Sequence, residues 1–307
     1  MRVLLSGSTG LLGSALLDGL RRQEYHFARL VRPSTRNPTT GPAGAPESPV
    51  IAWDPLAGTL DEAAGGSDAV IHLAGAPIGD GRWTASRKQI LRDSRVAATR
   101  HLVDSLARLA KPPQVFIAAS AIGFYGDRGD EMLTETSAPG HDFLADLCRS
   151  WEAESARAAS FGARVVILRF GIILAKQGGA LPRMTLPFKL GAGGRLGSGR
   201  QWMSWVALED AVGAVGHALA NGSLSGAVNV VSPNPVRNVE FTAALGRVLH
   251  RPALFPAPGF ALRLALGEMA DGLLLSSQRV MPEKLRAISY PFAYQQLESA
   301  LRSVLDR

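Results

Sequence analysis

A glycine-rich turn at the start of the chain constrains its fold more than any other feature. Residues 1–6 predict a buried strand, and Gly7, Gly10 and Gly13 follow at three-residue spacing before an apolar helical stretch. A strand, turn and helix in this order leave backbone N–H groups free at a helix N-terminus, where the helix dipole also favours negative charge. Glycine turns also occur for steric reasons alone, but this context favours a bound dinucleotide. The predicted cofactor contacts of the turn are Gly7, Thr9, Gly10, Leu11, Leu12 and Gly13.

The end of the second predicted strand, residues 25–31, indicates which dinucleotide. NAD-selective folds place a carboxylate about 20 residues past the glycines to hold the ribose 2′-hydroxyl. Here Val31 is followed by Arg32, with Ser34 and Arg36 close behind and no acid. A guanidinium pairs with a 2′-phosphate, so we expect NADP(H) at Val31, Arg32 and Arg36. The alternative is that Arg32 is a solvated residue at a strand end.

Composition suits a globular enzyme with a small anionic ligand. Of 307 residues, 46% are hydrophobic and 19% charged, and the net charge of +7 comes from scattered arginines rather than a basic run, so nucleic acid is not the expected partner. One cysteine, Cys148, excludes an intrachain disulfide and fits a reducing compartment. The six histidines show no metal-ligand spacing. We expect a cytoplasmic protein without a signal peptide or membrane partner, and a homodimer stays open.

Strands and helices alternate through the first two-thirds of the chain. This succession predicts an α/β fold, a Rossmann doubly wound parallel sheet. After residues 25–31, further strands are predicted at 50–53, 69–75, 115–120, 164–174 and 227–231, and helices at 60–64 and 90–109. Residues 33–49 are rich in Pro, Gly, Thr and Ser and predict a loop. Residues 260–275 contain three charged side chains and predict a packed amphipathic helix rather than a membrane span.

Two stretches do not fit that alternating core. We expect residues 1–175 and 205–232 to form an NADP(H)-binding Rossmann core. Residues 176–204 and 233–307 are expected to form a smaller, mainly helical lobe over the carboxyl edge of the sheet, where ligands bind in open α/β folds.

Several segments resemble the short-chain dehydrogenase/reductase superfamily in its extended branch: residues 6–13, 70–75, 119–127 and 205–210. More narrowly, the chain is similar to the atypical NAD-dependent epimerase/dehydratase-like family, sometimes labelled cell division inhibitor. That likeness rests on residues 123–135, 143–152, 190–205, 232–238 and 267–270, and extends over essentially the whole chain. The family label implies neither a substrate nor a reaction.

The resemblance implies further ligand contacts, each with a structural alternative. Leu73, Ala74 and Gly75 are expected beside the adenine ribose and phosphates, or serve strand-to-loop packing. Arg95 points at the cofactor or is solvated. Other expected contacts are Phe170 behind the nicotinamide ring and, for the substrate, Arg200 and Trp202, whose loop is otherwise structural.

The chain departs from the superfamily at its proton-transfer pair, a tyrosine followed four residues later by a lysine. None of the four tyrosines has such a lysine, and Leu144 and Cys148 stand at the aligned places. This leaves Ser120 and Tyr125 as catalytic candidates, although Ser120 can instead hold the turn after its strand and Tyr125 can line a pocket wall. Cys148 is expected to be a small buried residue rather than a nucleophile.

Two functions follow from these observations. The first is an NADP(H)-dependent oxidoreductase or epimerase-like enzyme acting on a small carbonyl or hydroxyl compound, sugar-nucleotide-like compounds included. The second is a catalytically silent NADPH-binding regulator. The missing dyad favours the regulator, whereas Ser120 and the loop at residues 191–205 favour the enzyme.

Overall fold

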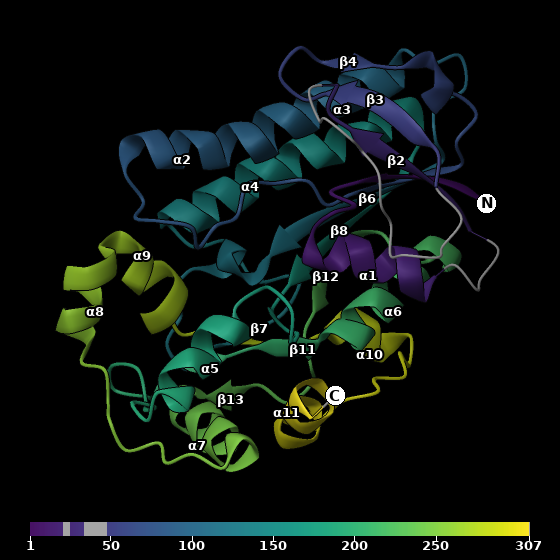
Figure 1. Ribbon diagram of the computed structural model, residues 1–307. Helices are drawn as coiled ribbons and strands as arrows, with labels where there is room; N and C mark the ends of the chain where they lie inside the picture. The colour runs from purple at the N-terminus through teal and green to yellow at the C-terminus, as the bar shows by residue number, and fades with distance from the viewer. Residues whose placement is uncertain (21–24, 34–47, 307) are drawn as a thin grey trace.

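The computed structural model describes residues 1–20, 25–33 and 48–306. Ser34 and Arg36 therefore lie outside the described residues. An eight-stranded sheet in the order β12-β8-β6-β5-β1-β2-β3-β4 forms the core (Figure 1). Its strands are β1 (Arg2–Ser6), β2 (His26–Val31), β3 (Val50–Asp54), β4 (Thr59–Leu60), β5 (Ala69–His72), β6 (Val115–Ala121), β8 (Arg164–Phe170) and β12 (Gly226–Val230). Every pair is parallel except β3–β4, which confirms the doubly wound Rossmann fold.

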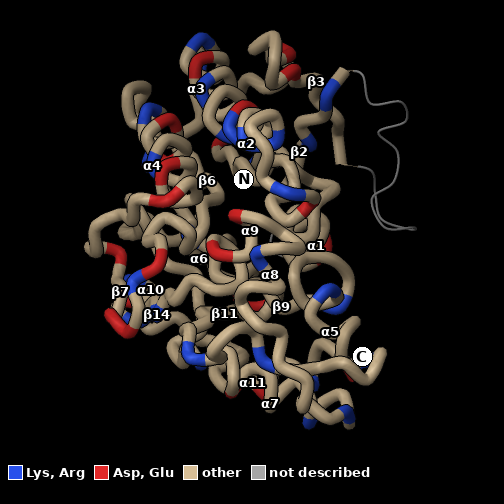
Figure 2. Tube along the Cα trace, turned by 90° about the vertical axis from the view of Figure 1, so that its left-hand side faces the viewer, with Lys and Arg blue, Asp and Glu red and all other residues tan. Residues whose placement is uncertain are grey.

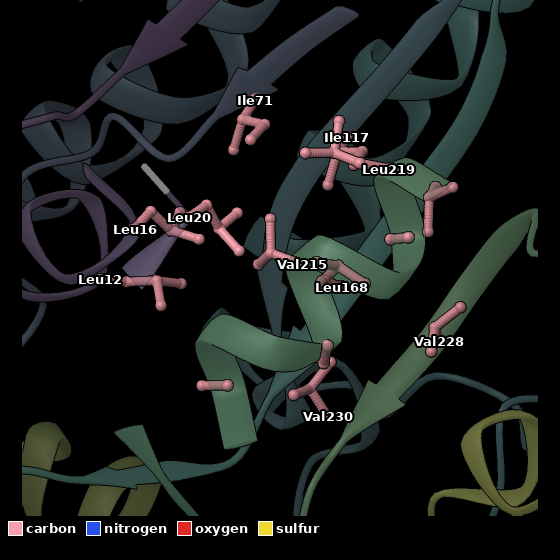
Figure 3. Packing of buried hydrophobic residues seen from close by; sticks show 14 of the residues in the cluster. Leu12, Leu16, Leu20, Ile71, Ile117, Leu168, Val215, Leu219, Val228 and Val230 are labelled. Atoms are coloured by element: carbon pink, nitrogen blue, oxygen red, sulfur yellow. The ribbon is translucent and has the colours of Figure 1, made fainter. Parts of the chain in front are cut away.

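Helices cover both faces of this sheet because its strands alternate apolar side chains between the two faces. Val3 and Leu5 of β1 join one apolar cluster, and Leu4 between them joins the other. On the first face lie α1 (Leu11–Gly19) and α6 (Leu208–Ala220). Figure 3 labels the side chains packed there, Leu12, Leu16, Leu20, Ile71, Ile117, Leu168, Val215, Leu219, Val228 and Val230. The second face is covered by a helical run of α2 (Ala85–Arg92), η2 (Asp93–Ala97) and α3 (Ala98–Ala107), with α4 (Phe143–Ala156) beside it.

A smaller, mainly helical part lies below the sheet in Figure 1. Its apolar cluster gathers around Trp205 and is built by α5 (Leu181–Lys189), α7 (Asn238–Leu249) and α11 (Leu297–Leu305). Three short strand pairs support it: β9 (Ile172–Leu174) with β11 (Trp205–Ala207), β10 (Trp202–Met203) with β13 (Val236–Arg237), and β7 (Met132–Leu133) with β14 (Arg279–Val280). The remaining elements are η1 (Glu62–Ala64), η3 (Ile122–Tyr125), η4 (Arg157–Phe161), α8 (Gly259–Leu266), α9 (Glu268–Ala270), η5 (Asp271–Leu275) and α10 (Glu283–Ala287). The boundaries expected for core and lobe stay a prediction.

Core and lobe are joined where three chain segments cross side by side. The Gly171 N–H donates to Val230 O over 3.1 Å, the Ile172 N–H to Ser204 O over 2.9 Å, and the Ser232 N–H to Trp205 O over 2.6 Å. An added Cβ at Gly171 would lie 2.6 Å from Ser204 O, so only glycine fits this close crossing. We call these three segments the junction.

Two predicted strands end earlier than expected. The strand predicted at 164–174 is divided at Gly171, because β9 leaves the large sheet there and pairs with β11. The strand predicted at 69–75 ends at His72, where the chain turns beside the glycine-rich turn.

Three predicted helices also differ. Residues 60–64 contribute Leu60 to β4, and only Glu62–Ala64 form a short 3₁₀ turn. The helix predicted at 90–109 begins at Ala85 and contains a π-helical turn. The segment 260–275 is broken at Gly267, which has φ +64°, so the expected single helix was wrong. Its first part, α8, buries none of its residues, whereas Met269 beyond the break is buried in a cluster with Trp83. Among the described residues, no helix is long and apolar enough to cross a membrane.

Candidate cofactor site and active site

The three glycines of the first turn have different tasks. Gly7 has φ +72°, and a Cβ there would lie 2.8 Å from the Leu73 carbonyl carbon. At Gly13 a Cβ would overlap the Gly7 carbonyl and lie 2.9 Å from Ser8 Cα. At Gly10 the single atom within 4 Å of an added Cβ, in the described part of the chain, is Gly7 O at 3.3 Å. Gly7 and Gly13 therefore permit packing, whereas Gly10 keeps the N-terminus of α1 open. Gly10 is also the N-cap of α1 and supplies no capping side chain, so the turn fits a pyrophosphate.

A buried histidine fixes the strand end that faces this turn. His72 Nδ1 lies 2.6 Å from Ser6 Oγ, and its Nε2 lies 2.9 Å from Thr99 Oγ1. Ser6 Oγ in turn accepts the Leu73 N–H over 3.2 Å. Burial lowers the pKa of His72 to about 4, so the imidazole is neutral and structural. This chain of contacts holds Leu73 and Ala74 against Gly7.

Arg95 lies underneath Gly75 rather than in solvent. An added Cβ on Gly75 would be 3.1 Å from the central guanidinium carbon of Arg95. Arg95 donates to Ala76 O over 2.9 Å, and its guanidinium lies 5.3 Å from the ring centroid of Trp151. Burial lowers the pKa of this guanidinium. The π-helical turn η2 brings it there, since it interrupts the regular helical spacing. The solvated alternative was wrong, and contact with the cofactor stays a prediction.

Arg32 follows β2 and is exposed, beside the turn after β3. The nearby Asp54 carboxylate accepts the backbone N–H groups of Leu56 and Ala57 over 2.8 and 3.2 Å. These bonds, with the Arg32 charge, lower the pKa of Asp54. The carboxylate is thus occupied by its own turn, while Arg32 has no ion-pair partner within 4.0 Å among the described residues. Val31 is half-buried beside it.

Ser120, at the carboxyl end of β6, is hydrogen-bonded to a buried ion pair. Its hydroxyl donates to Glu152 Oε1 over 2.6 Å. Arg169, the register partner of Ser120 on β8, donates to both oxygens of that carboxylate over 2.8 and 2.7 Å. The pair is buried, with the Arg169 side chain 5% and the Glu152 side chain 10% exposed. The network therefore fixes the direction of the Ser120 proton.

Tyr125 belongs to the same network and is fully buried. Its hydroxyl donates to Asn229 Oδ1 over 2.7 Å and accepts from Arg169 Nη1 over 2.9 Å. Burial raises the pKa of Tyr125. The hydroxyl is thus directed at protein partners. Sequence reasoning missed Glu152 and Arg169, although an arginine inside the apolar strand 164–170 is a signal for a buried acidic partner.

The two places aligned with the missing dyad carry apolar side chains. Leu144 is buried in a cluster with Trp83 and Met269. Cys148 is buried, and burial raises the pKa of its thiol to about 12. The expectation of a small, unreactive buried cysteine agrees with this geometry. Phe170 is 8% exposed and packs in the first-face cluster.

The loop before β11 gives Trp202 several partners within the protein. Its indole N–H donates to Asp130 Oδ1 over 2.7 Å, and the guanidiniums of Arg237 and Arg279 lie 4.7 and 4.6 Å from its ring centroid. Arg200 is exposed. Trp202 therefore ties three segments together, and substrate binding by Arg200 and Trp202 stays a prediction.

Residues 176–204 were expected over the carboxyl edge of the sheet, but their contact with the start of α1 was not predicted. Gly178 and Gly179 lie against the Leu11 side chain, at 3.6 and 3.1 Å from their added Cβ positions. From the following helix α5, Arg183 pairs with Asp80 over 2.5 Å and donates to Gly79 O over 2.5 Å. The segment therefore links the start of α1 to the loop after β5.

Comparisons with known proteins agree with this geometry. A model of the NAD-dependent epimerase/dehydratase family matches residues 3–231, and a domain of unknown function matches residues 257–304. An epimerase family protein of Mycobacterium leprae is 41% identical, covering 99% of this chain and 96% of its own length. The chloroplastic epimerase family protein SDR39U1 homolog of Arabidopsis thaliana is 37% identical, with 100% and 87% coverage.

Solved structures show the same likeness. Human epimerase family protein SDR39U1 (isoform 2), crystallised with NADPH, superposes with a TM-score of 0.88 at 30% identity, covering 100% of both chains. UDP-glucuronic acid 4-epimerase from Bacillus cereus in complex with NAD gives a TM-score of 0.76 at 17% identity, which supports the fold alone.

Proposed function

Because the chain belongs to the NAD-dependent epimerase/dehydratase family, we propose that it is an NADP(H)-dependent oxidoreductase or epimerase-like enzyme for a small carbonyl or hydroxyl compound. The open N-terminus of α1 at Gly10 supports this most directly, because it offers backbone donors to a pyrophosphate. The preference for NADP(H) is supported by the exposed Arg32 and by the NADPH in the human relative. When bound, the nicotinamide supplies hydride transfer.

Within this proposal Ser120 and Tyr125 have unequal roles. Ser120 directs its proton to Glu152 and also contacts the Cys148 thiol, and its oxygen is placed to accept a hydrogen bond from a substrate hydroxyl at the end of β6. Tyr125 acts as a positioning residue, since its hydroxyl holds Arg169, which holds Glu152. Proton exchange with the substrate then falls to water or to the substrate itself.

Cofactor titration tests the proposal. Wild-type protein is expected to bind NADPH at least roughly tenfold more tightly than NADH, since a hydrogen bond to a charged group is worth about 1.5–3 kcal/mol. Arg32→Ala should remove most of this difference. Arg149→Ala, which removes an exposed arginine of α4, is the matched control and should keep the preference. Equal affinities of the wild type for both cofactors would contradict the assignment.

A second candidate is a catalytically silent NADPH-binding regulator. It is favoured by the apolar Leu144 and the unreactive Cys148 at the places of the dyad. A carbonyl and polyol screen that follows nicotinamide absorbance separates the two. Turnover that falls in Ser120→Ala, with NADPH affinity kept, supports the enzyme. NADPH binding without turnover of any compound supports the regulator.

We further propose a cytoplasmic location and a small-molecule substrate rather than nucleic acid. The single buried thiol needs no oxidising compartment, and the excess arginines are scattered. Fractionation of cells followed by detection of the intact protein tests the location.

A further inference from the structure

Exposed apolar side chains gather on α5, on α8 and on the segment before α8. They comprise one side chain of α5, the residue that caps α5, two side chains of the segment before α8 and two of α8. They are Leu186, Leu190, Leu254, Phe255, Phe260 and Leu264, half of the twelve large apolar side chains that are exposed among the described residues. Leu264 is 77% and Leu190 75% exposed. Scattered apolar side chains are normal on a protein surface, but a concentration of this kind marks an interaction site.

The segments that carry these side chains are joined by backbone contacts. The Phe255 N–H donates to Gly193 O over 3.0 Å, and the Ala257 N–H donates to Arg195 O over 2.8 Å. Phe188 of α5 packs beneath, with its ring 2.5 Å from an added Cβ on Gly193. Figure 2 looks toward this side and shows α8 at the centre, with α5 and α7 below it. We call residues 186–196 and 251–264 together the α5–α8 face.

The two segments that carry this face are basic, although acids of neighbouring segments pair with three of their arginines: Arg183 with Asp80, Arg247 with Glu298 and Arg263 with Asp271. Residues 176–204 contain five basic side chains and no acidic one, and residues 241–267 contain three and none. Four exposed cations, Lys176, Lys189, Arg195 and Arg251, form no ion pair with any described residue. The face therefore combines apolar side chains with unpaired cations.

A small apolar cavity adjoins the face. It has a volume of about 170 Å³ and lies between Lys176 and Lys189. Its walls include Leu181, Leu186, Leu249 and Leu305. An apolar cavity flanked by two lysines suits a hydrocarbon segment attached to an anionic group, which is the chemistry of an anionic lipid.

We propose that the α5–α8 face docks on the surface of an anionic membrane. The exposed Leu and Phe side chains enter the boundary of headgroups and acyl chains, while the lysines and arginines contact lipid phosphates. A second copy of the chain is disfavoured as the occupant, because two such basic faces repel each other. This proposal sets peripheral binding, without a spanning helix, against the expectation of no membrane partner, and the vesicle experiment decides between them.

Vesicle co-sedimentation of the full chain tests the proposal. Vesicles of phosphatidylcholine with about 30% phosphatidylglycerol should bind the protein, and phosphatidylcholine alone should bind it at least roughly tenfold more weakly. Raising the salt to about 0.5 M should release it, since screening then acts within about 4–5 Å.

Two paired substitutions separate the apolar and the charge contributions. Lys189→Glu with Arg251→Glu and, separately, Phe260→Ser with Leu264→Ser should each weaken vesicle binding by at least roughly tenfold. Leu56→Ser, at a residue 79% exposed on the core, and Arg108→Glu on the core surface are the matched controls and should bind like wild type. All six replaced side chains are exposed, and equal thermal unfolding temperatures show that the variants fold.

Three outcomes overturn the proposal. One is equal binding to neutral and anionic vesicles, and another is binding that both paired variants retain. The third is a dimer in light scattering that Phe260→Ser with Leu264→Ser dissociates while the wild type ignores vesicles, because the face is then a contact between copies of the chain.

Discussion

Replacing Gly10 tests whether the absence of a side chain there serves the folding of the protein or the binding of its ligand. An alanine Cβ there would meet Gly7 O at 3.3 Å, a contact that a shift of a few tenths of an ångström relieves. The backbone at Gly10 has φ −77° and ψ 169°, which every residue adopts. We therefore expect Gly10→Ala to change the free energy of unfolding by less than about 1 kcal/mol.

Gly13→Ala is the matched contrast three residues later. Its Cβ would overlap the Gly7 carbonyl oxygen and lie 2.9 Å from Ser8 Cα, and these are backbone atoms that cannot rotate away. Overpacking of a tight site costs about 1–3 kcal/mol and sometimes more. We expect Gly13→Ala to destabilise the protein by about 3 kcal/mol, with a lower unfolding temperature even without ligand.

Substitution of Gly10 should weaken NADPH binding strongly although it changes the stability of the unliganded protein little. A side chain at Gly10 displaces a pyrophosphate from the first turn of α1, and loss of two charge-assisted hydrogen bonds costs at least about 3 kcal/mol. This predicts roughly 100-fold weaker NADPH binding for Gly10→Ala and no detectable binding for Gly10→Val. Calorimetric titration measures the affinity, and thermal and urea unfolding measure the stability.

Two results would refute this reasoning. If Gly10→Val folds like wild type and binds NADPH normally, Gly10 does not face the phosphates. If Gly10→Ala destabilises the unliganded protein as much as Gly13→Ala does, the contacts assigned to the two glycines are wrong.

Three further predictions concern the buried polar groups. The pKa of His72 is about 4 in the folded protein against 6.5 ordinarily, so between these values the unfolded chain binds a proton that the folded chain does not. The free energy of unfolding should therefore fall by about 3 kcal/mol as the pH drops from above 6.5 to 4. Urea unfolding at several pH values measures this dependence, which His72→Asn should flatten. Arg169→Met should lower the free energy of unfolding by about 3–5 kcal/mol, because it leaves the Glu152 carboxylate unpaired. Arg169→Met with Glu152→Leu should recover much of this loss, and a double variant no more stable than Arg169→Met alone would contradict the pairing. Cys148 should react with iodoacetamide only after unfolding, as mass spectrometry of the labelled protein can show.

The core sheet and the glycine-rich turn could be predicted from sequence because local patterns encode them. Apolar runs of five to seven residues separated by helices leave few arrangements other than a parallel sheet. The break at Gly171 could not be predicted, because its cause is the carbonyl of Ser204, more than thirty residues away. The continuation of the segment 69–75 as a loop is likewise decided by contact of Leu73 with Gly7.

The candidate site divides in the same way. Gly10 and Arg32 belong to a spacing rule that the sequence displays. The position of Arg95 depends on a π-helical turn, which periodicity does not reveal. The partners of Ser120 and Tyr125 come from two strands, β8 and β12, and from helix α4, so their network exists only after the sheet has formed.

The junction determines how ligands can enter and leave. A lobe attached by one flexible connection can rotate about it as about a hinge. Here three chain segments connect core and lobe, and backbone hydrogen bonds at Gly171, Ser204 and Ser232 join them to one another. Rotation of the lobe would shear those bonds together, so the angle between core and lobe is set once, during folding. Exchange of ligands is then expected to proceed by displacement of a local cover, and residues 176–180, which are exposed and belong to no helix or strand, are the piece of the wall that can move most easily, whereas Leu181 just after them is buried.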